Sequence, residues 1–168
     1  MILLLRLIHI LFGAYWMGAI AFVAIFLEPS VRAAGPAGGP FMAQLQKRKF
    51  SVWTMIAAAL TIVSGILLLG IDSNWFTSGF LSSKMAIALQ TGAGLAIIAA
   101  AFGSAFARPA AARLAVLMPQ LAQTAPGAER DKIDAECKRH LGRLAFAGRV
   151  AAGLVIVAVA LMAVARYL

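Results

Sequence analysis

The residues best suited to chemistry in this sequence are ionisable side chains within long apolar stretches. There are four of them, Arg6, His9, Lys84 and Arg149. A charged group in a bilayer interior costs free energy, so a residue of this kind is a functional candidate. Arg149 lies near the end of its stretch, where a long side chain extends to the interface. His9 lies about 9 Å inside its stretch, too deep for an imidazole to reach water.

His9 shares one helix face with three other residues. Arg6, His9, Gly13 and Trp16 have the spacing i, i+3, i+7 and i+10, which places them on the same side of a helix. A histidine with a glycine one turn deeper suits the axial ligation of a haem, because the glycine leaves room for a flat macrocycle. Arg6 could then contact a propionate. A histidine that only hydrogen-bonds to a neighbouring helix is the alternative that this helix leaves open.

Lys84, at the start of the third apolar stretch, is expected at the same depth as His9. The two side chains would then flank one site between the first and third helices. Gly65 of the second stretch lies at a similar level, where a small residue allows close packing or a ligand face. Met162 of the fourth stretch is a candidate second ligand. A lysine that only extends to the interface is the alternative.

Four apolar stretches must position these residues. The chain of 168 residues is 62% hydrophobic and 12% charged, which excludes a water-soluble enzyme. A helix of about 20 apolar residues spans the hydrocarbon core. We therefore predict one all-α domain, residues 1–168, built as a polytopic bundle of four transmembrane helices. The predicted spans are about 3–27, 52–71, 85–106 and 144–165. A turn rich in Gly and Pro, 28–40, ends the first span.

The distribution of positive charge predicts the orientation. The net charge is +9, and twelve of the fifteen basic residues lie in or beside the connections that follow the first and third spans. By the positive-inside rule these connections face the cytoplasm and both termini face the outside. We predict a multi-pass protein of a bacterial inner membrane. The basic excess then reflects topology and anionic lipid, and without a nucleic-acid motif we expect no nucleic-acid partner.

The third connection, residues 107–143, predicts a helical hairpin. Apolar residues such as Leu114, Leu117 and Cys137 recur at helical spacing on both sides of a turn with Pro and Gly. The hairpin would extend the third and fourth spans into the cytoplasm, and a mobile charged loop is the alternative. We expect His140 to be a surface or interfacial residue. No internal repeat is predicted.

Short motifs along the first half resemble a known family. The run LIHI at residues 7–10, followed by YWMG at 15–18, resembles the first span of the HemJ-type protoporphyrinogen oxidases and the membrane domain of copper-resistance protein D. The run LTIVSGILL at 60–68 is similar to the second HemJ span. The run GFLSSK at 79–84 is similar to the start of the third. The resemblance covers roughly the first 95 residues.

The resemblance implies a protein that binds haem b. Its functional pair, a histidine of the first span and a lysine of the third, corresponds to His9 and Lys84. Ser82 stands where the family has a histidine before the lysine. This departure favours haem binding over the oxidase activity itself.

The leading hypothesis is therefore an integral membrane redox protein with one haem b. It would transfer electrons or oxidise a porphyrin or lipophilic substrate, and whether it is an enzyme stays open. His9 would be the metal ligand, and His9 and Lys84 the catalytic pair. The residues expected around the cofactor are Arg6, His9, Gly13, Trp16, Gly65 and Lys84.

Two other functions remain as alternatives. The first is a non-enzymatic membrane scaffold or assembly subunit. Small residues step by four along the third span and suit helix packing or a homodimer: Gly92, Ala96, Ala100 and Ser104. The second is copper handling, by analogy with the copper-resistance membrane domain, with His9 as a ligand.

Overall fold

The computed structural model describes residues 1–34 and 38–168 and is all-α throughout them. Four continuous helical stretches are long and apolar enough to cross a membrane. They are Ile2–Ala33, Phe50–Asp72, Lys84–Gln123 and Ala128–Tyr167. The predicted all-α class and the four apolar helices are confirmed, and the chain is a candidate multi-pass membrane protein in contact with lipid.

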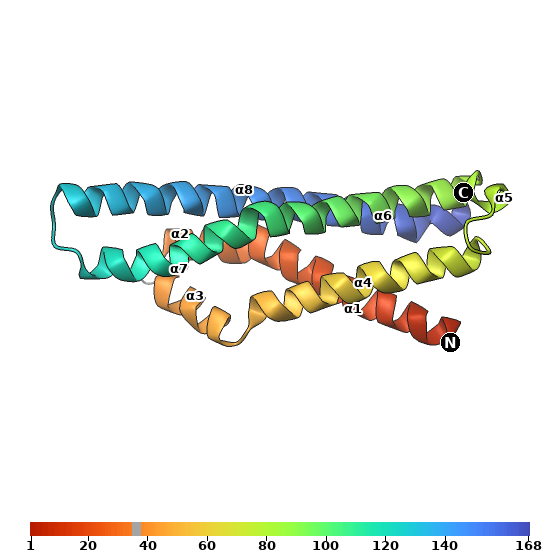
Figure 1. Cartoon of the computed structure of the whole chain (residues 1–168), viewed down its shortest axis with the longest axis horizontal. Helices are drawn as coiled ribbons and strands as arrows, with labels where there is room; N and C mark the ends of the chain where they lie inside the picture. The colour runs from red at the N-terminus through yellow and green to blue at the C-terminus, as the bar shows by residue number, and fades with distance from the viewer. Residues whose placement is uncertain (35–37) are drawn as a thin grey trace.

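The helices form two antiparallel pairs (Figure 1). The first pair is α1 (Ile2–Phe22) with α4 (Phe50–Asp72), and the second is α6 (Lys84–Phe102) with α8 (Ala128–Val164). Both termini and the short α5 (Ser78–Leu81) lie at one end of the bundle, here named the termini end. The turn between α7 (Arg108–Gln123) and α8 lies at the other, the hairpin end.

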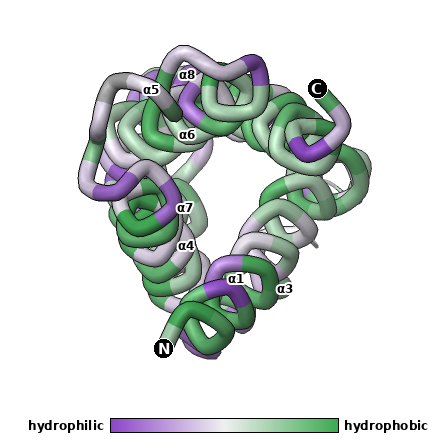
Figure 2. Tube along the Cα trace, turned by 90° about the vertical axis from the view of Figure 1, so that its right-hand side faces the viewer, coloured by the Kyte–Doolittle hydropathy of each residue, from purple (hydrophilic) through white to green (hydrophobic). Residues whose placement is uncertain are grey.

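The two pairs meet so that α1 contacts α8, whereas α1 and α6 make almost no contact. In the view along the bundle, α1 and α6 occupy opposite sides of the ring of helices (Figure 2). Large apolar side chains, such as those of Leu11, Val63 and Ile98, are exposed on the outer surfaces of the bundle. Contact with lipid rather than water explains why such a surface is stable.

The first long helix does not end where the sequence predicted. It continues from α1 through a π-helical turn, η1 (Val23–Leu27), into α2 (Glu28–Ala33). Pro29 lacks an N–H and would clash with the preceding turn of an ordinary α-helix. The wider π turn, in which the Glu28 N–H donates to Val23 O, lets the helix continue past it. The predicted turn at 28–40 is therefore wrong over α2, and its residues 35–37 lie outside the described residues.

The third long helix repeats this device. A second π turn, η3 (Gly103–Ala107), precedes Arg108-Pro109 and joins α6 to α7. Two phenylalanines pack against each other around each π turn, with ring centroids 6.2 Å apart in the first helix and 4.5 Å apart in the third. Phe102, Phe106 and Pro109 each follow their counterparts by 80 residues. The chain thus has two similar halves, although no internal repeat was predicted.

The core between the pairs consists mostly of small residues. Eight buried residues form it: Trp16, Ala57, Ala58, Ala96, Ala99, Ala151, Val155 and Ala158. A Cβ added at Gly92 would lie 3.0 Å from the backbone oxygen of Ala158, so α6 and α8 are in close contact. Gly92 and Ala96 are buried within the chain. Much of the small-residue stripe expected to suit a homodimer therefore packs within one chain.

The helical hairpin is present at the hairpin end. The buried side chains of Leu114, Leu117 and Cys137 form a small core of their own between α7 and α8. His140 was expected to be a surface or interfacial residue; it is only 7% exposed, so the surface position is wrong. It follows Cys137 by three residues on α8 and therefore lies on the same, inward face of the helix. In the first half of the chain, α3 (Gly38–Lys47) is the much shorter counterpart of this hairpin and leads into α4.

Candidate functional site

The imidazole of His9 lies between α1 and α4. Its Nδ1 atom is 2.8 Å from the backbone oxygen of Thr61 and 3.4 Å from Ser64 Oγ. A carbonyl oxygen only accepts, so Nδ1 carries the proton and donates to it. The Ser64 hydroxyl donates to Leu60 O at 2.5 Å. In the neutral ring, Nε2 then keeps its lone pair and can accept a proton or bind a metal.

Two glycines let α1 and α4 come together around this ring. A Cβ at Gly65 would lie 2.8 Å from His9 Cε1 and 3.1 Å from Nδ1, so the imidazole occupies the space that a side chain would need. A Cβ at Gly13 would meet the Thr61 methyl group at 3.4 Å. The structure therefore brings His9, Gly13 and Gly65 together as predicted. It uses the glycines for helix packing, whereas the prediction assigned Gly13 to a macrocycle.

Arg6 lies one turn from His9, toward the termini end. Its Nη2 atom is 3.7 Å from Asp72 Oδ1 at the end of α4, and more than half of the Arg6 side chain is exposed. This ion pair joins α1 to α4 beside the imidazole. The exposed guanidinium keeps N–H groups for a further acceptor.

Trp16 is not part of this cluster. It is 3% exposed and packs in the alanine-rich core with Ala57 and Val155. Trp16 follows His9 by seven residues, about 10 Å along the helix. Trp16 was predicted to lie beside a cofactor, and the structure instead places it in the core.

Lys84 and Met162 lie on the other pair of helices. Lys84 is the exposed first residue of α6, directly after Ser83, whose hydroxyl accepts from the Ala86 N–H. Met162 packs against Gly92, with its Cγ atom 3.0 Å from the position of an added Cβ. His9 packs on α4, and α1 barely contacts α6, the helix that begins with Lys84. Met162 is in contact with Gly92 of α6, and its contact there does not involve the imidazole.

The described residues, 1–34 and 38–168, hold no group of three or more His, Cys, Asp or Glu side chains that could bind a metal ion. The copper alternative therefore gains no support from the side chains around His9. Cys137 does not add a reactive thiol, because burial, followed by the nearby carboxylates of Asp134 and Glu136, raises its pKa. The His9 site offers one imidazole nitrogen.

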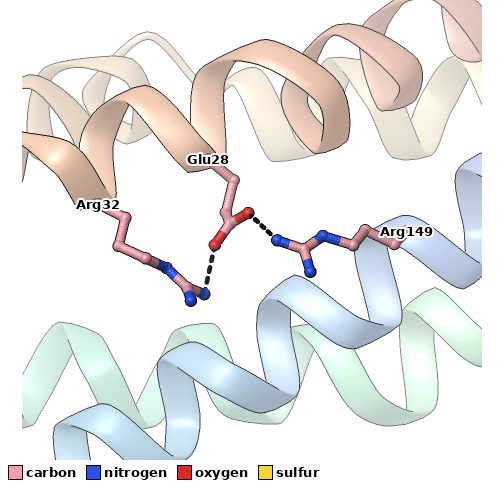
Figure 3. Close-up of polar contacts among 3 residues, drawn as sticks. All are labelled: Glu28, Arg32 and Arg149. Carbon is pink, nitrogen blue, oxygen red and sulfur yellow. Dashed lines mark hydrogen bonds and ion pairs between the residues drawn. The ribbon is translucent and has the colours of Figure 1, made fainter.

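A second polar cluster joins the first long helix to the middle of α8 (Figure 3). Glu28 Oε1 accepts from Arg32 Nη2 at 2.5 Å, and Glu28 Oε2 accepts from Arg149 Nη2 at 2.9 Å. Arg149 therefore pairs with a residue of α2, whereas it was expected only to extend to the interface. Glu28 was missed because it was placed in a turn. The signal that could have identified it is the pair of opposite charges, a carboxylate at the end of one apolar stretch and an arginine within another.

Comparison with known proteins adds no assignment to this geometry. The chain matches no protein-family model, no curated protein and no solved structure. The functional argument therefore rests on the residues themselves.

Proposed function

We propose that this chain is a multi-pass membrane redox protein that binds one b-type haem through His9 Nε2. The observation that carries the proposal is the 2.8 Å contact between His9 Nδ1 and the Thr61 backbone oxygen. Histidines that ligate metals commonly donate their second ring nitrogen to a carbonyl or carboxylate, which fixes the tautomer and raises the basicity of the ligand nitrogen. The resemblance of its motifs to those of the HemJ-type family supports the same assignment.

The residues around His9 fit such a group as a single-ligand site. Thr61 and Gly65 hold the imidazole, and Arg6 retains N–H groups that suit a propionate. In this proposal His9 is the one protein ligand, since Lys84 begins α6 and Met162 packs against Gly92. A b-type haem supplies one-electron transfer when bound.

The ion pairs of the first long helix support a position for His9 relative to the membrane. Glu28 follows Arg6 by 22 residues, about 33 Å of helix, which is close to the hydrocarbon thickness of about 30 Å. Both residues pair with another helix, Arg6 with Asp72 and Glu28 with Arg149. We infer that the two ion pairs lie at opposite membrane faces. His9 then lies about one turn below the face at the termini end.

The distribution of positive charge supports an orientation of the bundle in the membrane. The basic residues gather at the hairpin end, so we place that end in the cytoplasm and both termini outside, as in a bacterial inner membrane. A porphyrin or another lipophilic substrate would approach His9 through the outer leaflet. We propose electron transfer as the first function of the bound haem and oxidation of such a substrate as the second.

Absorption spectra of the purified protein test the proposal. Protein expressed with added haem precursor and purified in mild detergent should show a Soret band, with about one haem per chain. His9→Ala should remove the band. His140→Ala, the matched change at the other histidine, should retain it. A colourless protein after haem supplementation, or an unchanged band in His9→Ala, would contradict the assignment.

A non-enzymatic membrane subunit is the second candidate. It is favoured by the packing roles of Gly13, Trp16 and Gly65, each of which supports contact between helices. A protein of this kind would be colourless and would tolerate His9→Ala, so the same spectra separate the two candidates.

A further inference from the structure

Two guanidinium groups from different helices are held close together where α2 lies beside the middle of α8. Arg32 belongs to α2 and Arg149 to α8, and the Glu28 carboxylate accepts a hydrogen bond from each (Figure 3). One carboxylate thus bridges two positive charges, and the cluster keeps a net charge of +1. The bridge links α2 to α8 and keeps the two guanidinium groups near each other before any ligand arrives.

The two arginines are open to a ligand, whereas the carboxylate is not. The side chains of Arg32 and Arg149 are 59% and 58% exposed, and that of Glu28 is 20% exposed. A guanidinium has five N–H donors, and each of these arginines uses one nitrogen for Glu28. The remaining donors suit the oxygens of a phosphate, which arginine binds through two parallel hydrogen bonds.

The position of the cluster indicates the source of the phosphate. It lies about 33 Å of helix from the Arg6–Asp72 pair, at the level of the headgroups of the leaflet at the hairpin end. Exposed apolar side chains follow on the membrane side of both helices, Phe22 and Ile25 on the first and Ile156 on α8. Lipid headgroups and acyl chains are therefore the nearest ligands of matching chemistry.

We propose that Arg32 and Arg149, bridged by Glu28, bind the phosphate of an anionic phospholipid between α2 and α8. Anionic lipid is enriched in the cytoplasmic leaflet, which the basic hairpin end faces in the orientation inferred above. The site is separate from His9 and does not depend on a haem. It would stabilise the contact between the two halves of the bundle.

Lipid titration of the whole chain tests this site. Protein purified in an uncharged detergent is titrated with phosphatidylglycerol, with phosphatidylcholine or with inorganic phosphate, and bound lipid is counted by native mass spectrometry. Phosphatidylglycerol should bind with a stoichiometry of one at lower concentration than phosphatidylcholine. Inorganic phosphate should not displace it at an equal concentration. Binding of inorganic phosphate in place of the lipid would overturn the lipid assignment.

Paired variants locate the site. Arg32→Gln with Arg149→Gln should weaken phosphatidylglycerol binding by about tenfold or more, since each removes a charge-assisted hydrogen bond. Arg108→Gln with Arg113→Gln is the matched control, because it removes the same charge at exposed positions of the same end. An equal loss in both double variants would show general attraction to positive charge and overturn the proposal, as would no loss in the first.

A conservative pair keeps the test valid if the glutamine variant fails to fold. Arg32→Lys with Arg149→Lys retains both charges and the attraction to Glu28 but loses the planar fork. It should fold and bind phosphatidylglycerol more weakly than the wild type. Wild-type affinity in this variant would contradict a site built on guanidinium geometry. A Soret band, where the wild type has one, should persist in both double variants.

Discussion

The two halves of the molecule share an outline and differ in the contact that joins their helices. Each half pairs a helix containing a π turn and a proline with an antiparallel partner. In the first half the close contact is between His9 and Gly65, and a polar ring fills the space. In the second half Gly92 lies against the Ala158 backbone and the Met162 thioether. The architecture needs a glycine in each pair, but only the first pair places an ionisable group beside it.

The connections at the hairpin end differ as well. The first half turns back through the short α3, whereas the second extends into α7 and the long α8 with their own apolar core. The second half therefore has an additional helical hairpin with its own core, and the first half contains His9, the candidate haem ligand. Substitutions at equivalent positions should accordingly change stability in one half and ligand binding in the other.

The largest effect on stability is expected in the second half. In Gly92→Leu, the added side chain would begin 3.0 Å from the Ala158 oxygen, a backbone atom that cannot rotate away. Overpacking of this kind should cost about 3 kcal/mol of unfolding free energy, the upper end of its usual range. Thermal unfolding followed by tryptophan fluorescence measures the loss. Gly94→Leu, where an added Cβ meets nothing within 4 Å, is the control on the same helix, and an equal loss there would contradict close α6–α8 contact.

The corresponding change in the first half should alter binding more than stability. In Gly65→Ala the imidazole must turn away from the new Cβ, which breaks its bond to Thr61 O. The lost hydrogen bond costs about 1 kcal/mol, and the helix propensity of alanine returns about as much. Haem content, measured from the ratio of Soret to protein absorbance, should fall. Gly18→Ala, at an open position of α1, should leave it unchanged, and full haem content in Gly65→Ala would argue against the site.

The smallest effect concerns the hairpin that only the second half possesses. Burial raises the pKa of the Cys137 thiol, with Asp134 and Glu136 adding to the shift, so the folded hairpin holds little thiolate at neutral pH. Iodoacetamide should alkylate Cys137 more slowly than it alkylates the thiol of a double variant, Cys137→Ala with Ala122→Cys. In that variant the one thiol lies at an exposed position of α7. The rate at Cys137 should rise as the pH passes above 9.0, its ordinary value. Equal alkylation rates for the two thiols at neutral pH would show that Cys137 is not buried between α7 and α8.

The same thiol should contribute a pH dependence to stability. A pKa that is higher in the folded state means that folding favours the protonated thiol. The stabilisation is therefore complete below the unfolded-state pKa and is lost as the pH rises through the folded-state value. Cys137→Ala should remove this part of the pH dependence.

The sequence predicted the features that depend on composition and periodicity. Four apolar stretches became four long helices, and the leucine spacing on either side of the Pro-Gly turn became the hairpin. The common level of His9 and Gly65 also followed from their depth in the predicted spans. These features depend on the burial of apolar surface, which side-chain type records directly.

Features that depend on the backbone or on helix rotation could not be predicted in this way. The partner of His9 is the carbonyl of Thr61, a group that every residue carries. Lys84 shares a predicted depth with His9, but depth does not specify which helices are neighbours. Pro29 indicated a turn, since nothing in its local sequence shows that a π turn will carry the helix past it.

The π turns also determine the direction in which the following segment faces. Relative to an uninterrupted α-helix, one extra residue in a turn rotates everything after it by about 100°. The approach of Glu28 to Arg149 thus depends on the backbone of Val23–Leu27, where none of the three ion-pairing side chains lies. In the third helix the same rotation sets how Leu114 and Leu117 meet α8. Each π turn therefore sets the rotation of the segment that follows it, α2 in the first long helix and α7 in the third, about the helix axis. That rotation determines which side chains of the segment face α8.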